Sequence, residues 1–289
     1  MHKLFSITTF FGVFVFALFA YNDIVPSQQM ASVSASYTEP EYRIDVDDKA
    51  DIEKLPVSAF IVFDVETGEV FASKQADKSL PVASITKLVT AAAVADTLDL
   101  EATAVVANTD VYTEGRSGKL NPGEKYTYRE LLFPLLLESS NDVATVFERE
   151  TQGGIVKSMN SFVEKLGVQH TSFLDASGLS EKNISTANDL MTITSYVYKK
   201  SPHILDITKL SQFVGPYTGW VNNNPVLDNS YLGGKHGYTV AANRTIVSLF
   251  EEKFKAGSKT LGYIVLGSDD LKSDIATLRE YTAQSIYFQ

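Results

Sequence analysis

The distribution of apolar and polar positions divides the chain into three stretches. Residues 4–21 carry no charge and are rich in Phe, Val and Ala, and the cation Lys3 precedes them. This pattern is typical of a secretory signal peptide or of an N-terminal membrane anchor. A retained anchor is slightly favoured, because Leu18 stands where a signal cleaved after Ala20 prefers a small residue. Residues 22–53 are polar and acidic, and predict a flexible linker.

The pattern of a folded domain begins at about residue 54. Residues 57–73 contain two apolar runs around Glu66-Thr67-Gly68, which predict a β-hairpin. Residues 81–98 are rich in Ala, and almost every position from 81 to 95 is apolar or small, which predicts a helix. Four more helices are expected: 127–137, with a capping box of Thr127 and Glu130 and a kink at Pro134; one after the break at Ser139–Asp142; 155–167; and 185–200.

Strand patterning returns after Gly215. Residues 233–243, 244–253 and 261–268 are predicted as three strands that are joined by short turns. Residues 270–288 are amphipathic with a helical period, and predict a helix that closes the domain.

This order of elements predicts an α/β protein of the α+β type. An antiparallel sheet is assembled from both ends of the domain 54–289 and is flanked by helices, and an all-helical lobe over roughly 99–210 is inserted between the two halves. A cleft between the sheet and the lobe is the natural place for a substrate.

Composition narrows the choice of function. The 289 residues are 44% apolar, which suits one sizeable core. The net charge of −10 and the pI near 4.9 argue against nucleic acid as a partner. The absence of cysteine agrees with an exported protein that does without disulfides. The four histidines have no spacing typical of a metal site, so neither metal nor cofactor is expected.

Ser84 and Lys87 are the polar pair inside the Ala-rich helix. At a spacing of three residues they share one helix face, so that hydroxyl and amine approach each other. A serine hydroxyl becomes a nucleophile when a base takes its proton, and a lysine serves as that base when desolvation or a second cation lowers its pKa. The helix start also places the Ser84 N–H well for an oxyanion. Ser-x-x-Lys alone is a weak signal, because about one is expected by chance in a chain of this length.

Two further pairs strengthen the case for chemistry. Ser139-x-Asn141 lies at the break between two apolar helices, where a hydroxyl and an amide project into a cleft. Lys235-x-Gly237 lies at a predicted strand, where Lys235 supplies a second positive charge and Gly237 lets a substrate backbone approach. Each pair alone is adequately explained as a cap or a turn, whereas together they describe a serine-acylation site.

The three pairs, in this order, resemble the Ser-x-x-Lys, Ser-Asp-Asn and Lys-Thr-Gly motifs of the penicillin-recognising serine enzymes. From Val57 to about Leu278 the chain further resembles the low-molecular-mass D-alanyl-D-alanine carboxypeptidases of the serine S11 peptidase family. Four blocks carry this resemblance: "FDVETGEVFASKQADKSLPVASITKLVT", "LNPGEKYTYRELLFPLLLESSNDVA", "TSFLDASGLSEKNISTANDL" and "NNNPVLDNSYLGGKHGYT". The resemblance implies a β-lactamase/DD-peptidase-like fold.

The resemblance also implies a role for each residue. Ser84 attacks the carbonyl between two D-alanines, and Lys87 takes the proton of the Ser84 hydroxyl. Ser139 relays a proton to the leaving D-alanine, and Asn141 binds the peptide amide of the substrate. Lys235 supports the electrostatics and the terminal carboxylate. Water then hydrolyses the acyl-enzyme, and penicillin is expected to acylate the same serine.

The third motif departs from the family pattern. His236 stands where the family has Thr or Ser, whose hydroxyl helps to hold the substrate carboxylate. Imidazole is bulkier and titrates near neutral pH, so binding could become pH-dependent or shift towards cross-linked peptides; simple replacement of the usual residue is an equal alternative. Thr239 remains as a nearby hydroxyl, Gly237 follows the family, and the Tyr238 N–H is implied as an oxyanion donor.

The favoured function is therefore a D-Ala-D-Ala carboxypeptidase that trims peptidoglycan stem peptides. A DD-endopeptidase on the same scaffold is the near alternative. A class A β-lactamase is disfavoured, because no Glu between Asn141 and Lys235 has Asn four residues later. A noncatalytic penicillin sensor or binding module is disfavoured by the intact polar pairs. The expected location is outside the bacterial cytoplasm, at the outer face of the membrane or in the periplasm or cell wall, with the N-terminal segment as the membrane contact.

Overall fold

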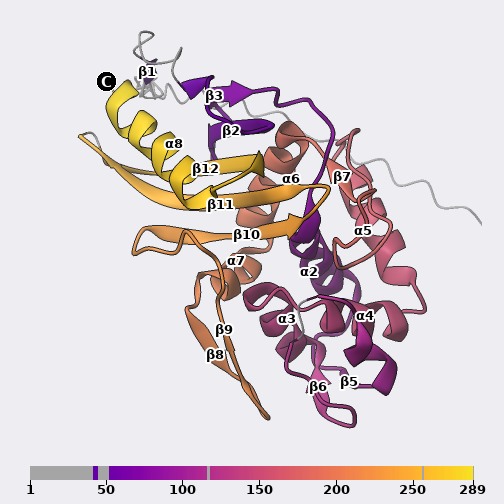
Figure 1. The fold of residues 1–289 in the computed structure, drawn as a ribbon. Helices are drawn as coiled ribbons and strands as arrows, with labels where there is room; N and C mark the ends of the chain where they lie inside the picture. The colour runs from indigo at the N-terminus through magenta and orange to yellow at the C-terminus, as the bar shows by residue number, and fades with distance from the viewer. Residues whose placement is uncertain (1–41, 45–51, 116–117, 256, 289) are drawn as a thin grey trace, which may run out of the picture. The chain divides into compact units, whose positions relative to one another are not determined.

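The computed structural model describes residues 42–44, 52–115, 118–255 and 257–288 (Figure 1). The predicted signal or anchor over 1–21, and most of the predicted linker, lie outside the described residues. Within the described ranges, no helix combines the length and the apolar character that crossing a bilayer requires. In the part of the linker that is described, β1 (Tyr42–Ile44) pairs antiparallel with β13 (Ile286–Phe288).

A five-stranded antiparallel sheet forms the first half of the domain, and its strands come from both ends as predicted. The strand order is β10-β11-β12-β2-β3. The bounds are β2 (Ala59–Asp64), β3 (Val70–Lys74), β10 (Tyr231–Thr239), β11 (Asn243–Phe254) and β12 (Gly257–Ser268). β12 pairs with β2 through Ile264 opposite Ile61, which joins the two chain ends in the middle of the sheet.

The two faces of the sheet are covered by different helices, because side chains alternate along each strand. Val247 and Leu249 of β11 belong to the apolar cluster shared with the helical lobe, whereas Ile246 and Phe250 belong to a second cluster. That second cluster includes residues of α8 (Leu271–Ser285), which packs on β11 and β12 (Figure 1). The sheet is thus buried on both faces.

The helical lobe holds the predicted helices and some elements that the sequence did not suggest. Thr127 and Glu130 form the expected capping box, with Glu130 N–H to Thr127 Oγ1 at 3.1 Å and Thr127 N–H to Glu130 Oε2 at 2.8 Å. The helices are α2 (Thr86–Thr97), α3 (Tyr128–Leu137), α4 (Asn141–Glu150), α5 (Gly154–Lys165), α6 (Ala187–Lys200) and α7 (Pro202–Lys209).

Short strands and turns complete the fold. Helix α7 and a hairpin over residues 212–221 were not predicted. Three two-stranded sheets complete the strand list. In the lobe, β4 (Leu80–Pro81) pairs with β7 (Ile184–Ser185), and β5 (Thr103–Val105) pairs with β6 (Lys125–Thr127). In the hairpin, β8 (Gln212–Val214) pairs with β9 (Gly219–Val221). The 3₁₀ turns are η1 (Ala83–Ile85) and η2 (Asn108–Tyr112).

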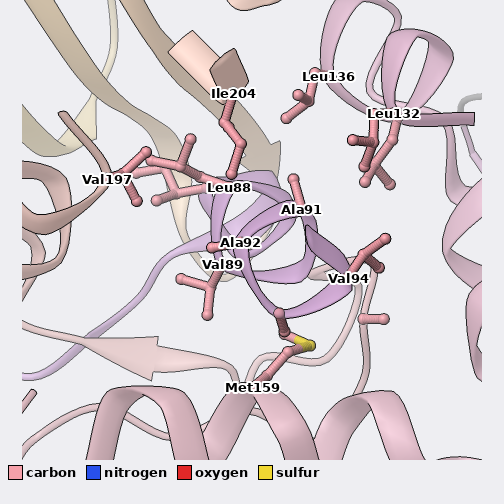
Figure 2. Close-up of a cluster of buried hydrophobic side chains, with 14 of the residues drawn as sticks. Leu88, Val89, Ala91, Ala92, Val94, Leu132, Leu136, Met159, Val197 and Ile204 are labelled. Carbon is pink, nitrogen blue, oxygen red and sulfur yellow. The ribbon is translucent and has the colours of Figure 1, made fainter. Parts of the chain in front are cut away.

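Helix α2 is the centre of the lobe. Its apolar side chains, such as Leu88, Ala91 and Val94, point towards α3, α5, α6 and α7 (Figure 2). Residues 86–94 of α2 are buried on every side, which explains why this segment lacks an amphipathic pattern. The Ala side chains let neighbouring helices approach closely, so α2 is held rigidly on several sides.

Core packing around α2 predicts a large loss of stability when Leu132 is truncated. Leu132 is 1% exposed, so Leu132→Ala should lower the free energy of unfolding by about 2–5 kcal/mol through lost burial and a residual cavity. The same change at Leu174, which is 61% exposed, should stay within about 0.5 kcal/mol. Urea denaturation of both variants tests this, and equal losses would contradict the assigned core.

Candidate active site

Ser84 lies in the turn η1, immediately before α2 begins. Ala83, the residue before it, has a φ of +49°, a left-handed conformation that is uncommon for a residue with a side chain. The turn leads directly into α2, so Ser84 and Lys87 lie one helical turn apart, as their spacing predicts. The Lys87 Nζ donates a hydrogen bond to Ser84 Oγ at 3.1 Å.

Lys87 is fully buried, and its Nζ has oxygen partners from three segments. Besides Ser84 Oγ, it donates to Asn141 Oδ1 at 2.7 Å and to the backbone carbonyl of Ser177 at 2.5 Å. The two carbonyl oxygens can only accept, so they bind N–H groups of the amine, whereas the Ser84 hydroxyl can either accept from Nζ or donate to it. The amine is therefore held at one position relative to the serine hydroxyl, and burial excludes water as a competing partner.

Ser139 and Asn141 lie at the junction of α3 and α4. Ser139 has a φ of +63°, and the Ser140 hydroxyl caps α4 by accepting from Val143 N–H at 3.1 Å. Asn141 accepts from Lys87 and donates through Nδ2 to the carbonyl of Glu114 at 2.7 Å. These two bonds fix which end of the amide faces the lysine.

Strand β10 brings the third pair to the same place. Lys235 is 2% exposed, and its Nζ donates to the backbone carbonyl of His236 at 2.6 Å. β11 is tied to the serine turn, because Thr245 Oγ1 donates to the Val82 carbonyl at 2.9 Å. The edge strand β10 contacts the same turn, so both strands lie against the start of α2.

Two glycines lie against the backbone of Ser84. A Cβ added at Gly237 would lie 2.4 Å from Ser84 N, and one added at Gly178 would lie 2.1 Å from the Ala83 carbonyl oxygen and 3.0 Å from Ser84 N. Only a residue without a side chain fits at either position. The strand and the 175–180 segment therefore approach the serine backbone from two directions.

A cavity of about 510 Å³ opens where these elements meet. It contains most of the predicted site residues, while Lys87 and Lys235 are buried and are not among those that line it. The predicted residues that line it are Ser84, Ser139, Asn141, His236, Gly237, Tyr238 and Thr239. The others are Gly115, Gly178, Leu179, Asn223, Pro225, Arg244 and Leu271, to which sequence analysis gave no part in the site.

Arg244 is the most informative of the residues that sequence analysis missed. It pairs with Tyr238 across the β10–β11 hairpin, and its guanidinium carbon lies 5.5 Å from the centre of the Tyr238 ring. No Asp or Glu occurs among the described residues that line the cavity. The positive charge of Arg244 at the β10–β11 hairpin side of the cavity favours an anionic group in the ligand. The hairpin register was the available signal, because a turn at 240–242 places residue 244 opposite residue 238.

Asp175 organises the segment that contacts Lys87. Its carboxylate accepts from the N–H groups of Ser177 at 2.8 Å, Gly178 at 2.6 Å and Ser180 at 2.7 Å, and from the Ser177 hydroxyl at 2.8 Å. Burial raises the pKa of Asp175, but these hydrogen bonds outweigh it, and the net pKa lies below the ordinary value of 3.8. The charged form of Asp175 therefore holds the Ser177 carbonyl in place.

The β8–β9 hairpin precedes the loop from which Asn223 and Pro225 line the cavity. Trp220 of β9 is fully buried, so it fills the core and does not rim the cleft. Its indole N–H donates to the carbonyl of Gly118 at 2.6 Å. Gly118 N–H in turn donates to the buried carboxyl of Asp142 at 3.3 Å, and burial raises the pKa of Asp142. The hairpin and α4 thus hold the same backbone segment.

Known proteins with similar sequences are D-alanyl-D-alanine peptidases. The family model described as D-alanyl-D-alanine carboxypeptidase, peptidase S11, matches residues 47–269. The chain is 33% identical to the D-alanyl-D-alanine carboxypeptidase DacB2 of Mycobacterium tuberculosis over 203 residues, which cover 66% of this chain and 69% of that protein. It is 34% identical to the D-alanyl-D-alanine endopeptidase of Pseudomonas aeruginosa over 143 residues, which cover 48% of this chain and 46% of that protein.

A solved structure is similar as well. The crystal structure of a D-alanyl-D-alanine carboxypeptidase from M. tuberculosis superposes with a TM-score of 0.72 at 30% sequence identity, and the match covers 78% of this chain and 90% of that one. The predicted fold class, a DD-peptidase-like arrangement of sheet and helices, is thereby confirmed.

The contact of Gly237 with Ser84 predicts that Gly237→Ala slows acylation. The new Cβ must push β10 away from the serine backbone, and a displacement of about 1 Å at a reacting centre costs about 10²-fold in rate. Gly154→Ala is the matched control, because its Cβ would lie 3.7 Å from Thr151 Cβ, an ordinary contact. Labelling rates with a fluorescent penicillin test both variants, and equal rates would refute the proposed contact.

The lowered pKa of Asp175 predicts an acid-dependent loss of stability. Because the pKa is lower in the folded state, the ionised carboxylate stabilises the fold above about pH 4, and this contribution is lost as the pH falls through the folded-state pKa. In Asp175→Asn, the amide cannot accept all four hydrogen bonds, so the free energy of unfolding at pH 7 should fall by about 1–3 kcal/mol.

Denaturant unfolding between pH 7 and pH 2 measures both effects of the Asp175 change. The wild-type protein should lose stability more steeply than Asp175→Asn below pH 4, so that the two curves converge. Parallel curves would show that Asp175 is not the carboxylate responsible.

Proposed function

The chain belongs to the S11 family of serine peptidases, the D-alanyl-D-alanine carboxypeptidases. On that premise we propose that it hydrolyses the terminal D-Ala-D-Ala bond of peptidoglycan stem peptides and that Ser84 is the nucleophile. One observation carries this assignment. A serine hydroxyl at the wall of a cavity is hydrogen-bonded to a fully buried lysine, and the serine N–H lies beside a glycine of an edge strand.

In the first step, the Lys87 amine acts as the general base. The neutral amine takes the Ser84 hydroxyl proton across the 3.1 Å contact while Oγ attacks the substrate carbonyl. Burial disfavours a charged ammonium, which makes the neutral amine accessible in this position. The N–H groups of Ser84 and Tyr238 stabilise the negative oxygen of the tetrahedral intermediate.

In the second step, the C–N bond breaks and D-alanine leaves with a proton on its amine. Ser139, at the junction of α3 and α4, relays this proton from Lys87 to the leaving group. Asn141 binds the substrate peptide amide, and Lys235 supplies positive charge behind β10. Water then attacks the acyl-enzyme carbonyl while Lys87 takes a proton from it. The proton passes to Ser84 Oγ as the ester bond breaks and the shortened peptide leaves.

The terminal carboxylate of the substrate binds at the basic end of the cavity. Arg244 provides a permanent positive charge there, and Thr239 provides a hydroxyl. Gly237 keeps the β10 backbone open to an extended peptide. Penicillins acylate Ser84 by the same route, because a β-lactam is a cyclic amide whose leaving group stays attached to the acyl chain.

Cleavage of cross-linked peptidoglycan is the second candidate function. The relative from P. aeruginosa is named an endopeptidase, and His236 lines the cavity where the family pattern has a hydroxyl. An imidazole lacks the fixed hydroxyl donor to a carboxylate, and could accommodate an amide there.

The location follows from the substrate. Peptidoglycan lies outside the cytoplasmic membrane, so an enzyme that acts on it must be exported. The uncharged segment 4–21 supports export and a membrane contact as further parts of the proposal.

Replacement of Ser84 tests the proposed function. The full chain, purified in detergent, should release D-alanine from diacetyl-L-Lys-D-Ala-D-Ala and become labelled by a fluorescent penicillin. Ser84→Ala should abolish labelling and lower the rate of D-alanine release by at least about 10³-fold. Ser211→Ala is the matched control, because Ser211 is exposed and lies outside the cavity.

Two other outcomes would overturn this assignment. Labelling followed by rapid penicillin turnover, without D-alanine release, would indicate a β-lactamase. An unmodified Ser84 together with no hydrolysis of either compound would exclude an acyl-enzyme at this residue.

A further inference from the structure

Asn183 joins the two segments on which the contact of Ser84 with Lys87 depends. It is fully buried and does not line the cavity. Its backbone carbonyl accepts from the Val82 N–H at 3.0 Å, at the start of the serine turn. Its side-chain amide bonds to the segment that carries the Ser177 carbonyl, and also to helix α2. One residue therefore connects the turn of the nucleophile, the helix of the lysine and the backbone that contacts the lysine.

The side-chain amide of Asn183 makes four hydrogen bonds. Its Oδ1 accepts from the N–H of Leu174 at 2.8 Å and from the N–H of Asp175 at 3.3 Å. Its Nδ2 donates to the Asp175 carbonyl at 3.0 Å and to Thr86 Oγ1 at 3.2 Å. Backbone N–H groups only donate and a carbonyl only accepts, so these partners fix which end of the amide faces which segment. A buried amide that is satisfied in this way holds its neighbours in one arrangement.

Thr86 is the point on α2 to which Asn183 is bonded. It lies between Ser84 and Lys87 along the chain, in the first turn of the helix, and it is fully buried. The segment that Asn183 holds presents the Ser177 carbonyl to Lys87 Nζ. A shift of this segment along α2 would move the carbonyl, and with it the amine that lies 3.1 Å from the serine hydroxyl.

The same segment has a second attachment to α2, one turn beyond Thr86. Thr90 Oγ1 donates to the Ala176 carbonyl at 2.8 Å, and Glu148 Oε1 accepts from the Ala176 N–H at 2.7 Å. These bonds hold the segment against the middle of the helix and against α4. The contacts of Asn183 differ from them, because they tie the segment to the start of α2 and to the serine turn as well.

We propose that Asn183 is a positioning residue for acylation: through Thr86 it holds the Ser177 carbonyl, and thereby the Lys87 amine, in register with the Ser84 hydroxyl. The inference rests on the proposed function, because it needs Ser84 to be the nucleophile. Neither Asn183 nor Thr86 lines the cavity, so their loss should slow the covalent step and leave the affinity of the noncovalent complex unchanged. A misplacement of about 1 Å at a reacting centre costs about 10²-fold in rate.

Variants of Thr86 test the inference with little disturbance of the fold. Labelling of the full chain in detergent is followed over a range of fluorescent-penicillin concentrations, which separates the maximal acylation rate from the Kd of the noncovalent complex. Thr86→Val keeps the shape of the side chain but removes the acceptor, and should lower the maximal rate about tenfold with an unchanged Kd. Thr86→Ser keeps the hydroxyl and should retain the wild-type rate.

Changes at Asn183 itself show whether it acts through Thr86. Asn183→Ala removes all four side-chain bonds and should lower the maximal acylation rate about 10²-fold. Thr86→Val added to that variant should cause no further loss, because the hydroxyl has already lost its amide partner. Thr194→Val is the matched control. Thr194 is fully buried in α6, and within the described part of the chain its hydroxyl has no hydrogen-bond partner, so this variant should acylate like the wild-type protein.

Several results would overturn the inference while the wild-type Ser84 is still labelled. These are a Thr86→Val rate equal to that of the wild-type protein, a loss shared by Thr86→Ser or Thr194→Val, a change in Kd in place of the rate, and losses at Thr86 and Asn183 that simply multiply. Urea denaturation shows which variants fold, and the Thr86 variants decide the outcome if Asn183→Ala does not. Absence of labelling in the wild-type protein overturns the proposed function, and the inference with it.

Discussion

The three oxygen atoms around the Lys87 Nζ are the constraint on which the site depends. They come from the serine turn, from the first residue of α4 and from the carbonyl of Ser177, so one buried amine joins three separate parts of the lobe. Loss of any partner would leave a buried polar group unsatisfied, which is costly in the interior of a protein. Packing of the neighbouring helices on α2 and the hydrogen bonds of the Asp175 carboxylate hold these oxygens in place.

Close packing against two glycines fixes the position of the Ser84 backbone. The backbone of Ser84 lies against two glycines, and neither the strand nor the 175–180 segment could approach so near if a methyl group stood there. The left-handed φ of Ala83 and of Ser139 are local costs of the same arrangement, and the surrounding core holds both residues in these conformations. Positive charge is the third element of the site: Arg244 lines the cavity, and Lys235 is buried in β10.

Sequence reasoning captured the parts of this architecture that are encoded locally. The Ser84–Lys87 spacing, the Thr127 capping box and the strand over 244–253 depend on neighbours within a few residues, and they were predicted. The β8–β9 hairpin, Arg244 and the role of Gly178 depend on contacts with distant segments, which a period or a motif does not reveal. Gly178 reads as an ordinary turn residue until Ala83, 95 positions earlier, is seen against it.

The wide separation of the site's parts along the chain has a consequence for folding. The contact of Lys87 with Ser177 spans 90 residues, and that of Thr245 with Val82 spans 163. Contacts of such length form late, because each one closes a long loop at an entropic cost before it gains stability. On the proposed mechanism, a partly folded chain lacks the assembled site, so acylation of Ser84 would measure the fraction of molecules that have completed folding.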